Sequence, residues 1–155
     1  MNLLRIQLAK HLEGGEAFMP VSEMLEKITF EDINTRPYDL PYSFYELFFH
    51  IVFAQKDIVK FTCSDDYKKP KWPDYYWPKD KICKNARDWE DLKAEYFADR
   101  NRLRNFLLDE KNPLDGVVKN GEGNQTLLRE VLLVIEHCAY HTGQLLIVLR
   151  LLNLH

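Results

Sequence analysis

The final segment of the chain, from Gln125 to Asn153, restricts the possible folds more than any other. Folded as a helix, this segment has apolar residues on most of its sides. Such a helix is central in a bundle, crosses a membrane or packs against a second copy of the chain. Polar and charged residues interrupt it more often than a lone membrane span tolerates. They are Arg129, Glu130, Glu136, His137, His141, Gln144 and Arg150. We therefore expect a long, buried helix in a soluble protein and no membrane association.

The chain begins with two short stretches of helical spacing, residues 3–12 and 21–28. Their apolar residues recur every three or four positions. Gly14, Gly15 and Pro20 interrupt this pattern, because glycine and proline favour turns over a helix interior. We expect two helical pieces with a bend between them, which together form one element of a bundle.

Two longer amphipathic segments occupy the middle of the chain. Ser43 and Glu46 form a capping-box pattern, which predicts a helix that starts there and continues to about Phe61. Asp88 is the expected N-cap of the next helix, which continues to Asp109. The positions expected on the solvent side of the first of these helices are Lys56, Asp57 and Lys60. Together with the other helical segments, these two helices predict an all-α four-helix bundle in a single domain, residues 1–155.

A long, aromatic and proline-rich crossover loop is expected at residues 63–86, between the second and third helical elements. It has no helical or strand periodicity, and loops of this length in a compact domain are often functional. If Trp72, Tyr76 or Trp77 borders a functional site, the loop shapes a substrate pocket. If these rings cover the opposite end of the bundle, they are part of the core.

Charge and cysteine usage exclude some classes of function. The net charge of -3, from 21 basic and 24 acidic residues mixed along the chain, offers no basic surface for nucleic acid. The three cysteines show no CxxC spacing, so neither a disulfide framework nor a zinc knuckle is expected. The N-terminal residues lack the continuous apolar stretch of a secretory signal. We expect a protein of the reducing cytoplasm.

The histidines indicate a metal site. His137 and His141 are four residues apart, so their side chains are about 40° apart around a helix and ~6 Å along it, and both can reach one ion. A site of this kind needs a further ligand from another element. His50 lies on an apolar helix face, where an unpartnered imidazole is costly to bury. The pattern predicts a divalent metal held by His50, His137 and His141. The alternative is core histidines with hydrogen-bonded rings.

Other polar residues near these histidines have weaker functional interpretations. Glu136 precedes the first histidine of the pair, whereas the H-E-x-x-H helix of zinc proteases has its glutamate after it, so a metalloprotease is excluded. Gln144 and Glu130 lie on or near the same stripe and could orient an imidazole. The capping box explains Glu46, and Cys138 is expected to be a small core residue.

Five segments carry a resemblance to a known family. They are Leu40–Ser43 leading into Glu46–His50, Phe53–Ile58, Lys71–Pro73, Tyr76–Pro78 and Glu136–Gln144. Together they resemble the DinB-like (YfiT-type) superfamily over nearly the whole chain. The most specific part is the H-x3-H-x-G-Q helix combined with a histidine in the second long helix. The resemblance implies a metal site of three histidines, which are His50, His137 and His141 in this sequence.

The resemblance also implies a fold and a range of functions. The expected fold is an up-down-down-up four-helix bundle, often dimeric, with zinc or nickel at one end. Similar proteins include transferases and isomerases that use low-molecular-weight thiols, and proteins described as metal-dependent hydrolases. We expect a homodimeric, metal-dependent thiol transferase or hydrolase that acts on a small molecule, with catalytic residues unknown. The alternative is a non-catalytic bundle whose metal stabilises the fold or whose role is to sense a ligand.

Overall fold

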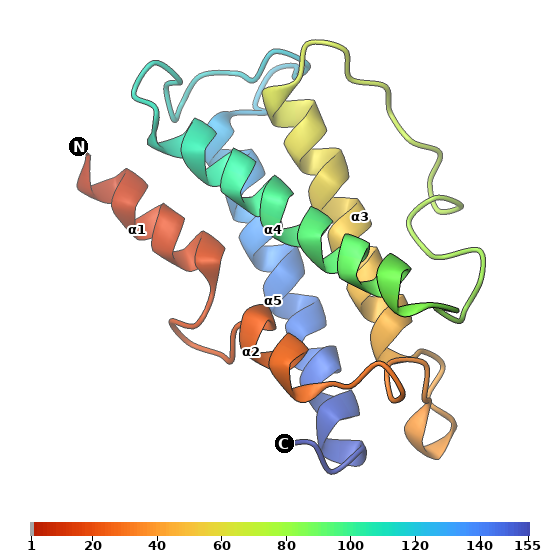
Figure 1. Ribbon diagram of the computed structural model, residues 1–155. Helices are drawn as coiled ribbons and strands as arrows, with labels where there is room; N and C mark the ends of the chain where they lie inside the picture. The colour runs from red at the N-terminus through yellow and green to blue at the C-terminus, as the bar shows by residue number, and fades with distance from the viewer. Residues whose placement is uncertain (1) are drawn as a thin grey trace.

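The chain is all-α in a computed structural model that describes residues 2–155 (Figure 1). The elements are α1 (Leu3–Glu13), α2 (Val21–Lys27), the short 3-10 helix η1 (Pro37–Asp39), α3 (Phe44–Cys63), α4 (Ala86–Leu108) and α5 (Leu127–Leu151). The only β-type pairing within the described residues is an isolated bridge between Val117 and Thr126. The predicted all-α class is confirmed.

Side chains that accept backbone N–H groups of the first turn set the helix starts. At α3 the predicted capping box is present: Ser43 accepts from the Glu46 N–H, and the Glu46 carboxylate accepts from the Ser43 N–H. At α4 the prediction of Asp88 as N-cap is wrong. Asn85 is the N-cap, because its side chain accepts from the Asp88 N–H at 2.9 Å and donates to the Asp88 carboxylate at 2.7 Å.

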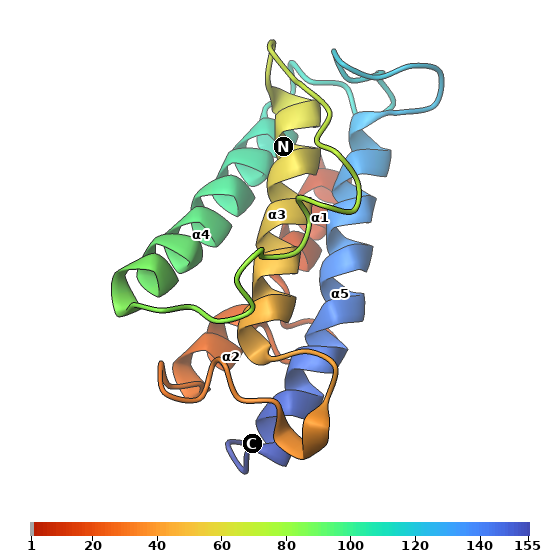
Figure 2. The same cartoon turned by 90° about the vertical axis from the view of Figure 1, so that its right-hand side faces the viewer.

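Helix α5 is the central helix of the fold, because it contacts each of the other four α-helices. Helix α3 packs against both α4 and α5. In Figures 1 and 2, α3 and α4 run in the same direction, α5 runs in the opposite direction, and residues 64–85 return the chain along the molecule between α3 and α4. The first predicted element is divided into α1 and α2 by a turn in which Gly14 and Gly15 have positive φ values of 85° and 87°.

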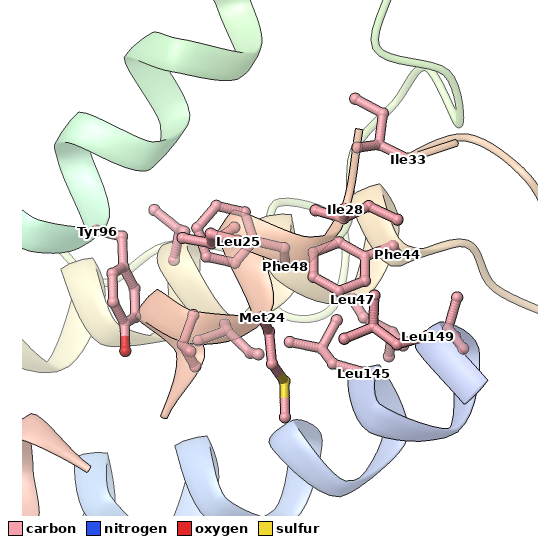
Figure 3. Packing of buried hydrophobic residues seen from close by; sticks show 14 of the residues in the cluster. Met24, Leu25, Ile28, Ile33, Phe44, Leu47, Phe48, Tyr96, Leu145 and Leu149 are labelled. Carbon is pink, nitrogen blue, oxygen red and sulfur yellow. The ribbon is translucent and has the colours of Figure 1, made fainter. Parts of the chain in front are cut away.

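The apolar core consists of two clusters that α5 joins. One lies among α2, the first halves of α3 and α4, and the second half of α5, and Figure 3 shows ten of its residues by name. The other lies among α1, the ends of α3 and α4, and the first half of α5. Along α5, Val134 is the last buried residue of the cluster that contains α1, and Cys138 is the first buried residue of the cluster that contains α2. His137 therefore lies at the boundary between the two clusters.

Helix α5 is also the one helix in residues 2–155 that is long and apolar enough to cross a membrane. Its most apolar stretch has a mean hydropathy of 1.4, and 39% of that stretch is buried. A core helix of a soluble protein meets the same criteria of length and composition. The packing of α5 against every other α-helix is compatible with such a core helix.

Truncation of Phe48 tests the first core cluster. This side chain has no exposed surface, and its ring lies 5.2 Å from that of Trp89 and 5.6 Å from that of Tyr96. We expect Phe48→Ala to lower the free energy of unfolding by about 3–5 kcal/mol, measured by urea denaturation. Phe97→Ala is the matched control, because the same truncation is made at a ring that is 41% exposed. Equal losses in the two variants would contradict this packing.

Candidate metal centre

The three predicted histidines come together between α3 and α5. His50 on α3 is 4% exposed, His141 on α5 is 8% exposed, and His137 on α5 is half-buried. The ring centroids are 4.9 Å apart for His50 and His137, 4.6 Å for His50 and His141, and 4.5 Å for His137 and His141. One nitrogen from each ring lies within 4.8 Å of the other two. The group could therefore hold one metal ion.

Hydrogen bonds fix the ring nitrogen that two of these histidines offer. Nδ1 of His50 lies 3.0 Å from the carbonyl oxygen of Tyr76, and Nδ1 of His141 lies 2.5 Å from Oε1 of Gln144. Both oxygens are acceptors only, so each Nδ1 carries the proton. In the neutral ring Nε2 is then left with a free lone pair, as a metal ligand requires. Gln144 was predicted to orient an imidazole, and in the structure it makes the hydrogen bond to His141 that this role requires.

Nε2 of His137 faces Nε2 of His50 at a distance of 3.1 Å. Two nitrogen lone pairs at this distance repel each other, so a positive centre has to lie between or beside them. In the metal-free state this is a proton on one ring, and a divalent cation can fill the same role for all three rings. The donor set of three imidazoles suits zinc and nickel.

Burial holds these imidazoles in the neutral form that binds metal. Burial lowers the pKa of His50 and of His141 below the ordinary value. For His137, burial together with the charges that His141 and His50 would carry lowers the pKa to about 4. All three rings are therefore neutral near pH 7, which is the form of imidazole that binds metal.

Aromatic rings surround the histidines on two sides. The ring of Trp77, from the crossover loop, stacks on His50 with centroids 4.2 Å apart and planes 6° apart. On α5 the ring of Tyr140 meets His141 edge-on at 4.9 Å. Trp72 does not touch the histidines but packs against Tyr76 at 4.8 Å. Of the two roles considered for the loop, the contacts of Tyr76 and Trp77 place it beside the candidate site.

A hollow of about 320 Å³ opens beside the site along α5, lined by Leu133, Glu136, His137 and Tyr140. Its lining is mostly apolar, with Glu136 as its carboxylate. A second cavity, of about 340 Å³, lies against the C-terminal end of α3 and the segment before α5, and none of the three histidines lines it. Of these two cavities, the hollow along α5 is the one that borders a candidate ligand, His137.

Two acidic residues near the site differ from their predicted roles. Glu130 is buried, but its side chain pairs with Arg129 at 2.5 Å, with no bond to a histidine among the described contacts. Asp57 was expected to face solvent, yet its carboxylate accepts hydrogen bonds from Tyr67 and Tyr76. The sequence does contain an indication that Asp57 lies on the side of α3 that carries His50. The two residues are seven positions apart, and this spacing places both on one face of a helix.

Comparisons with known proteins agree with this site. The sequence profile of the DinB superfamily matches residues 17–145, which include all three histidines. No curated protein and no solved structure matches the chain. Because the matched region is more than half of the sequence, the chain belongs to the DinB superfamily.

The lowered pKa of His137 predicts how the stability of the metal-free protein depends on pH. As the pH falls from 6.5 towards 4, the unfolded chain takes up a proton at this residue and the folded chain does not. The free energy of unfolding therefore falls over this range. His137→Gln should remove about 1–2 kcal/mol of this dependence, allowing for the partial exposure of the ring. Urea denaturation of both proteins with a chelator present measures it, and identical pH profiles would contradict the shift.

Proposed function

We propose that this protein is a metal-dependent enzyme that acts on a small molecule, with one zinc or nickel ion held by His50, His137 and His141. The observation that carries the proposal is the donor set. Three imidazole nitrogens converge, and the group includes no cysteine, aspartate or glutamate among residues 2–155. Three protein ligands with positions left open are typical of catalytic sites, whereas structural sites are closed by a fourth.

The chemistry proposed for the site is thiol transfer or hydrolysis. A divalent ion held by three neutral ligands would keep its full charge and favour the deprotonated form of a thiol or of water. The chain's own contribution is to keep three imidazoles neutral, to aim Nε2 of His50 and His141 at one point, and to exclude water from one side with the Trp77 ring. We favour a low-molecular-weight thiol as one reactant.

The hollow beside His137 supports a substrate that is small and largely apolar. Leu133 and Tyr140 supply apolar surface, and Tyr140 is 68% exposed, so its ring is available for contact. Glu136 lies at the same hollow and can accept a proton from a bound thiol or water. A negative charge at this position disfavours an anionic substrate.

Further parts of the proposal concern assembly and location. We infer an up-down-down-up four-helix bundle in one domain, with α1 and α2 together as its first element, in a cytoplasmic protein. We also infer a homodimer, because Leu132 and Ile147 leave apolar surface exposed along α5, with 46% and 48% of their surfaces exposed. A monomer in sedimentation experiments at high concentration would contradict the dimer.

Metal content tests the proposed site. The purified, untagged protein should contain about one zinc or nickel ion per chain by plasma mass spectrometry. Replacement of His50, His137 or His141 by Ala should weaken binding by more than about 100-fold, because loss of an outer hydrogen-bond partner alone typically costs ~10–100-fold. His11→Ala is the matched control, since His11 is an exposed histidine on α1. Binding that survives in the triple variant would contradict the site.

Activity is tested with the metal-loaded protein. Thiol transfer to small electrophiles and hydrolysis of small esters are compared for the wild type and the His141→Ala variant. Turnover that requires both metal and His141 would support an enzyme. Metal binding without turnover, together with a thermal midpoint raised by the metal, would favour the non-catalytic alternative, in which the ion stabilises the bundle.

A further inference from the structure

The carboxylate of Asp57 joins the crossover loop to α3. One of its oxygens accepts a hydrogen bond from the Tyr67 hydroxyl at 2.9 Å, and the other accepts one from the Tyr76 hydroxyl at 2.5 Å. Both tyrosines belong to the loop and are partly buried, whereas Asp57 lies on α3, two helical turns beyond His50. One carboxylate thus holds two points of the loop that are nine residues apart in sequence.

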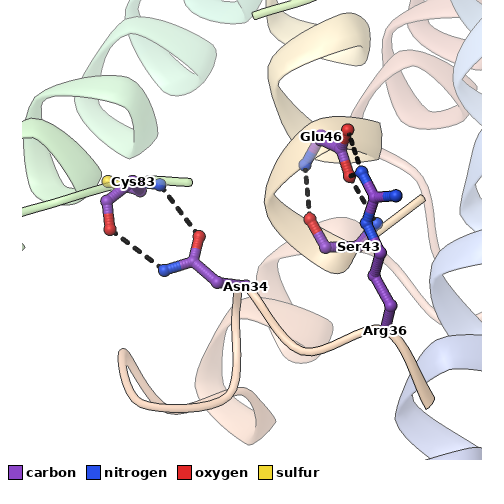
Figure 4. A network of polar contacts seen from close by, with 5 residues as sticks. All are labelled: Asn34, Arg36, Ser43, Glu46 and Cys83. Carbon is purple, nitrogen blue, oxygen red and sulfur yellow. Dashed lines mark hydrogen bonds and ion pairs between the residues drawn. The ribbon is translucent and has the colours of Figure 1, made fainter. Parts of the chain in front are cut away.

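A separate pair of hydrogen bonds holds the far end of the loop. The Asn34 side chain donates to the Cys83 carbonyl oxygen at 3.0 Å and accepts from the Cys83 N–H at 2.9 Å (Figure 4). The Tyr76 ring also packs edge-on against Phe53 of α3, at 5.1 Å. Between these points the loop is largely exposed, as the 50% exposed ring of Tyr75 illustrates. Asp57 is therefore the side chain that anchors the tyrosine hydroxyls of the central part of the loop.

Tyr76 connects this anchor to the candidate metal centre. Its hydroxyl is held by Asp57, and its backbone carbonyl accepts the Nδ1–H of His50. The next residue, Trp77, stacks on the same imidazole. A single loop residue, fixed at its side chain, thus determines the hydrogen bond that leaves Nε2 of His50 free for a ligand.

We propose that Asp57 is a positioning residue, which holds the crossover loop so that Tyr76 and Trp77 fix the tautomer and orientation of His50. The benefit to metal binding rests on the proposed function, but the effect on the His50 ring does not. Asp57 acts through Tyr76 and does not touch the histidines in the described contacts.

The electrostatic environment supports this role. Burial, and next to it the hydrogen bond to Asp57, raises the pKa of both Tyr67 and Tyr76 above the ordinary value. Both phenols therefore remain donors throughout the neutral range. Hydrogen bonds from neutral hydroxyls to an ionised carboxylate are shorter and stronger than those between neutral groups. An amide at position 57 would have one acceptor oxygen and could not accept from both hydroxyls in the same way.

The test compares Asp57→Asn and Tyr76→Phe with a matched control, Tyr75→Phe. The control removes a hydroxyl from the neighbouring loop residue, whose ring is half exposed. The first readout is the ¹⁵N shifts of the His50 ring in chelator-treated protein, assigned with a His50→Gln variant. We expect the wild type and the control to show a protonated Nδ1 and a free Nε2. Asp57→Asn and Tyr76→Phe should show a mixture of the two tautomers.

Two further readouts report on the loop and on the metal. Cleavage by trypsin after Lys71, Lys79 or Lys81 should become about tenfold faster in Asp57→Asn, because losing these hydrogen bonds increases local opening by about this factor. The affinity for zinc should fall by at least about threefold. This loss should be smaller than the ~10–100-fold loss expected for a residue that hydrogen-bonds a metal-binding histidine directly. The control should match the wild type in both experiments.

The outcomes separate this inference from the proposed function. If the wild type binds no metal, the metal centre fails, and the ¹⁵N shifts and the trypsin cleavage still decide the role of Asp57. If metal binds but the His50 shifts and the cleavage rates of Asp57→Asn equal those of the control, the role of Asp57 is overturned. A loss of zinc affinity with an unchanged His50 tautomer would also overturn it, since the proposed path runs through this ring.

Discussion

The burial of three imidazoles where α3 packs against α5 is the constraint on which the rest of this structure depends. Each ring carries two nitrogens that need partners, and burial keeps the rings neutral by lowering the pKa of all three. The outer nitrogens of His50 and His141 have acceptors in Tyr76 and Gln144. The remaining nitrogens face one another, and their lone pairs would repel without a proton or a cation among them.

This constraint gives a physical reason for the long crossover. Helices α3 and α4 run in the same direction, so the chain has to return along the molecule between them (Figure 2). The return path passes the histidines and there supplies a carbonyl acceptor and a flat aromatic surface, from Tyr76 and Trp77. The loop is therefore both the connection that the helix order requires and one wall of the site. Its attachment to Asp57 makes the two roles compatible.

Much of the fold and the three candidate ligands could be predicted from sequence because these signals are local. Helical spacing identifies the helices, and His137 and His141 share a face whatever the rest of the chain does. The capping box at Ser43 is equally local. The N-cap of α4 was misplaced because Asn85 and Asp88 are both good capping residues, and the bond from Asn85 to the Asp88 N–H decides between them.

The loop contacts could not be predicted in the same way. Residues 64–85 have no periodicity, so nothing in the sequence says which ring meets which helix. The pairing of Asp57 with Tyr67 and Tyr76 joins positions 10 and 19 residues apart through a path that only the folded chain defines. Glu130 shares a helix face with the histidines, but its carboxylate pairs with the adjacent Arg129. Side-chain partners of this kind depend on tertiary packing.

We propose that Nε2 of three histidines, and no other protein atom, holds one divalent ion. Anomalous diffraction at the metal edge, from crystals of zinc-loaded protein, tests it most directly. We expect one peak per chain, ~2.0–2.1 Å from Nε2 of His50, His137 and His141, with the remaining positions free of protein ligands. A peak bound through Nδ1 of His50, a fourth ligand from the protein, or a peak away from these residues would contradict it.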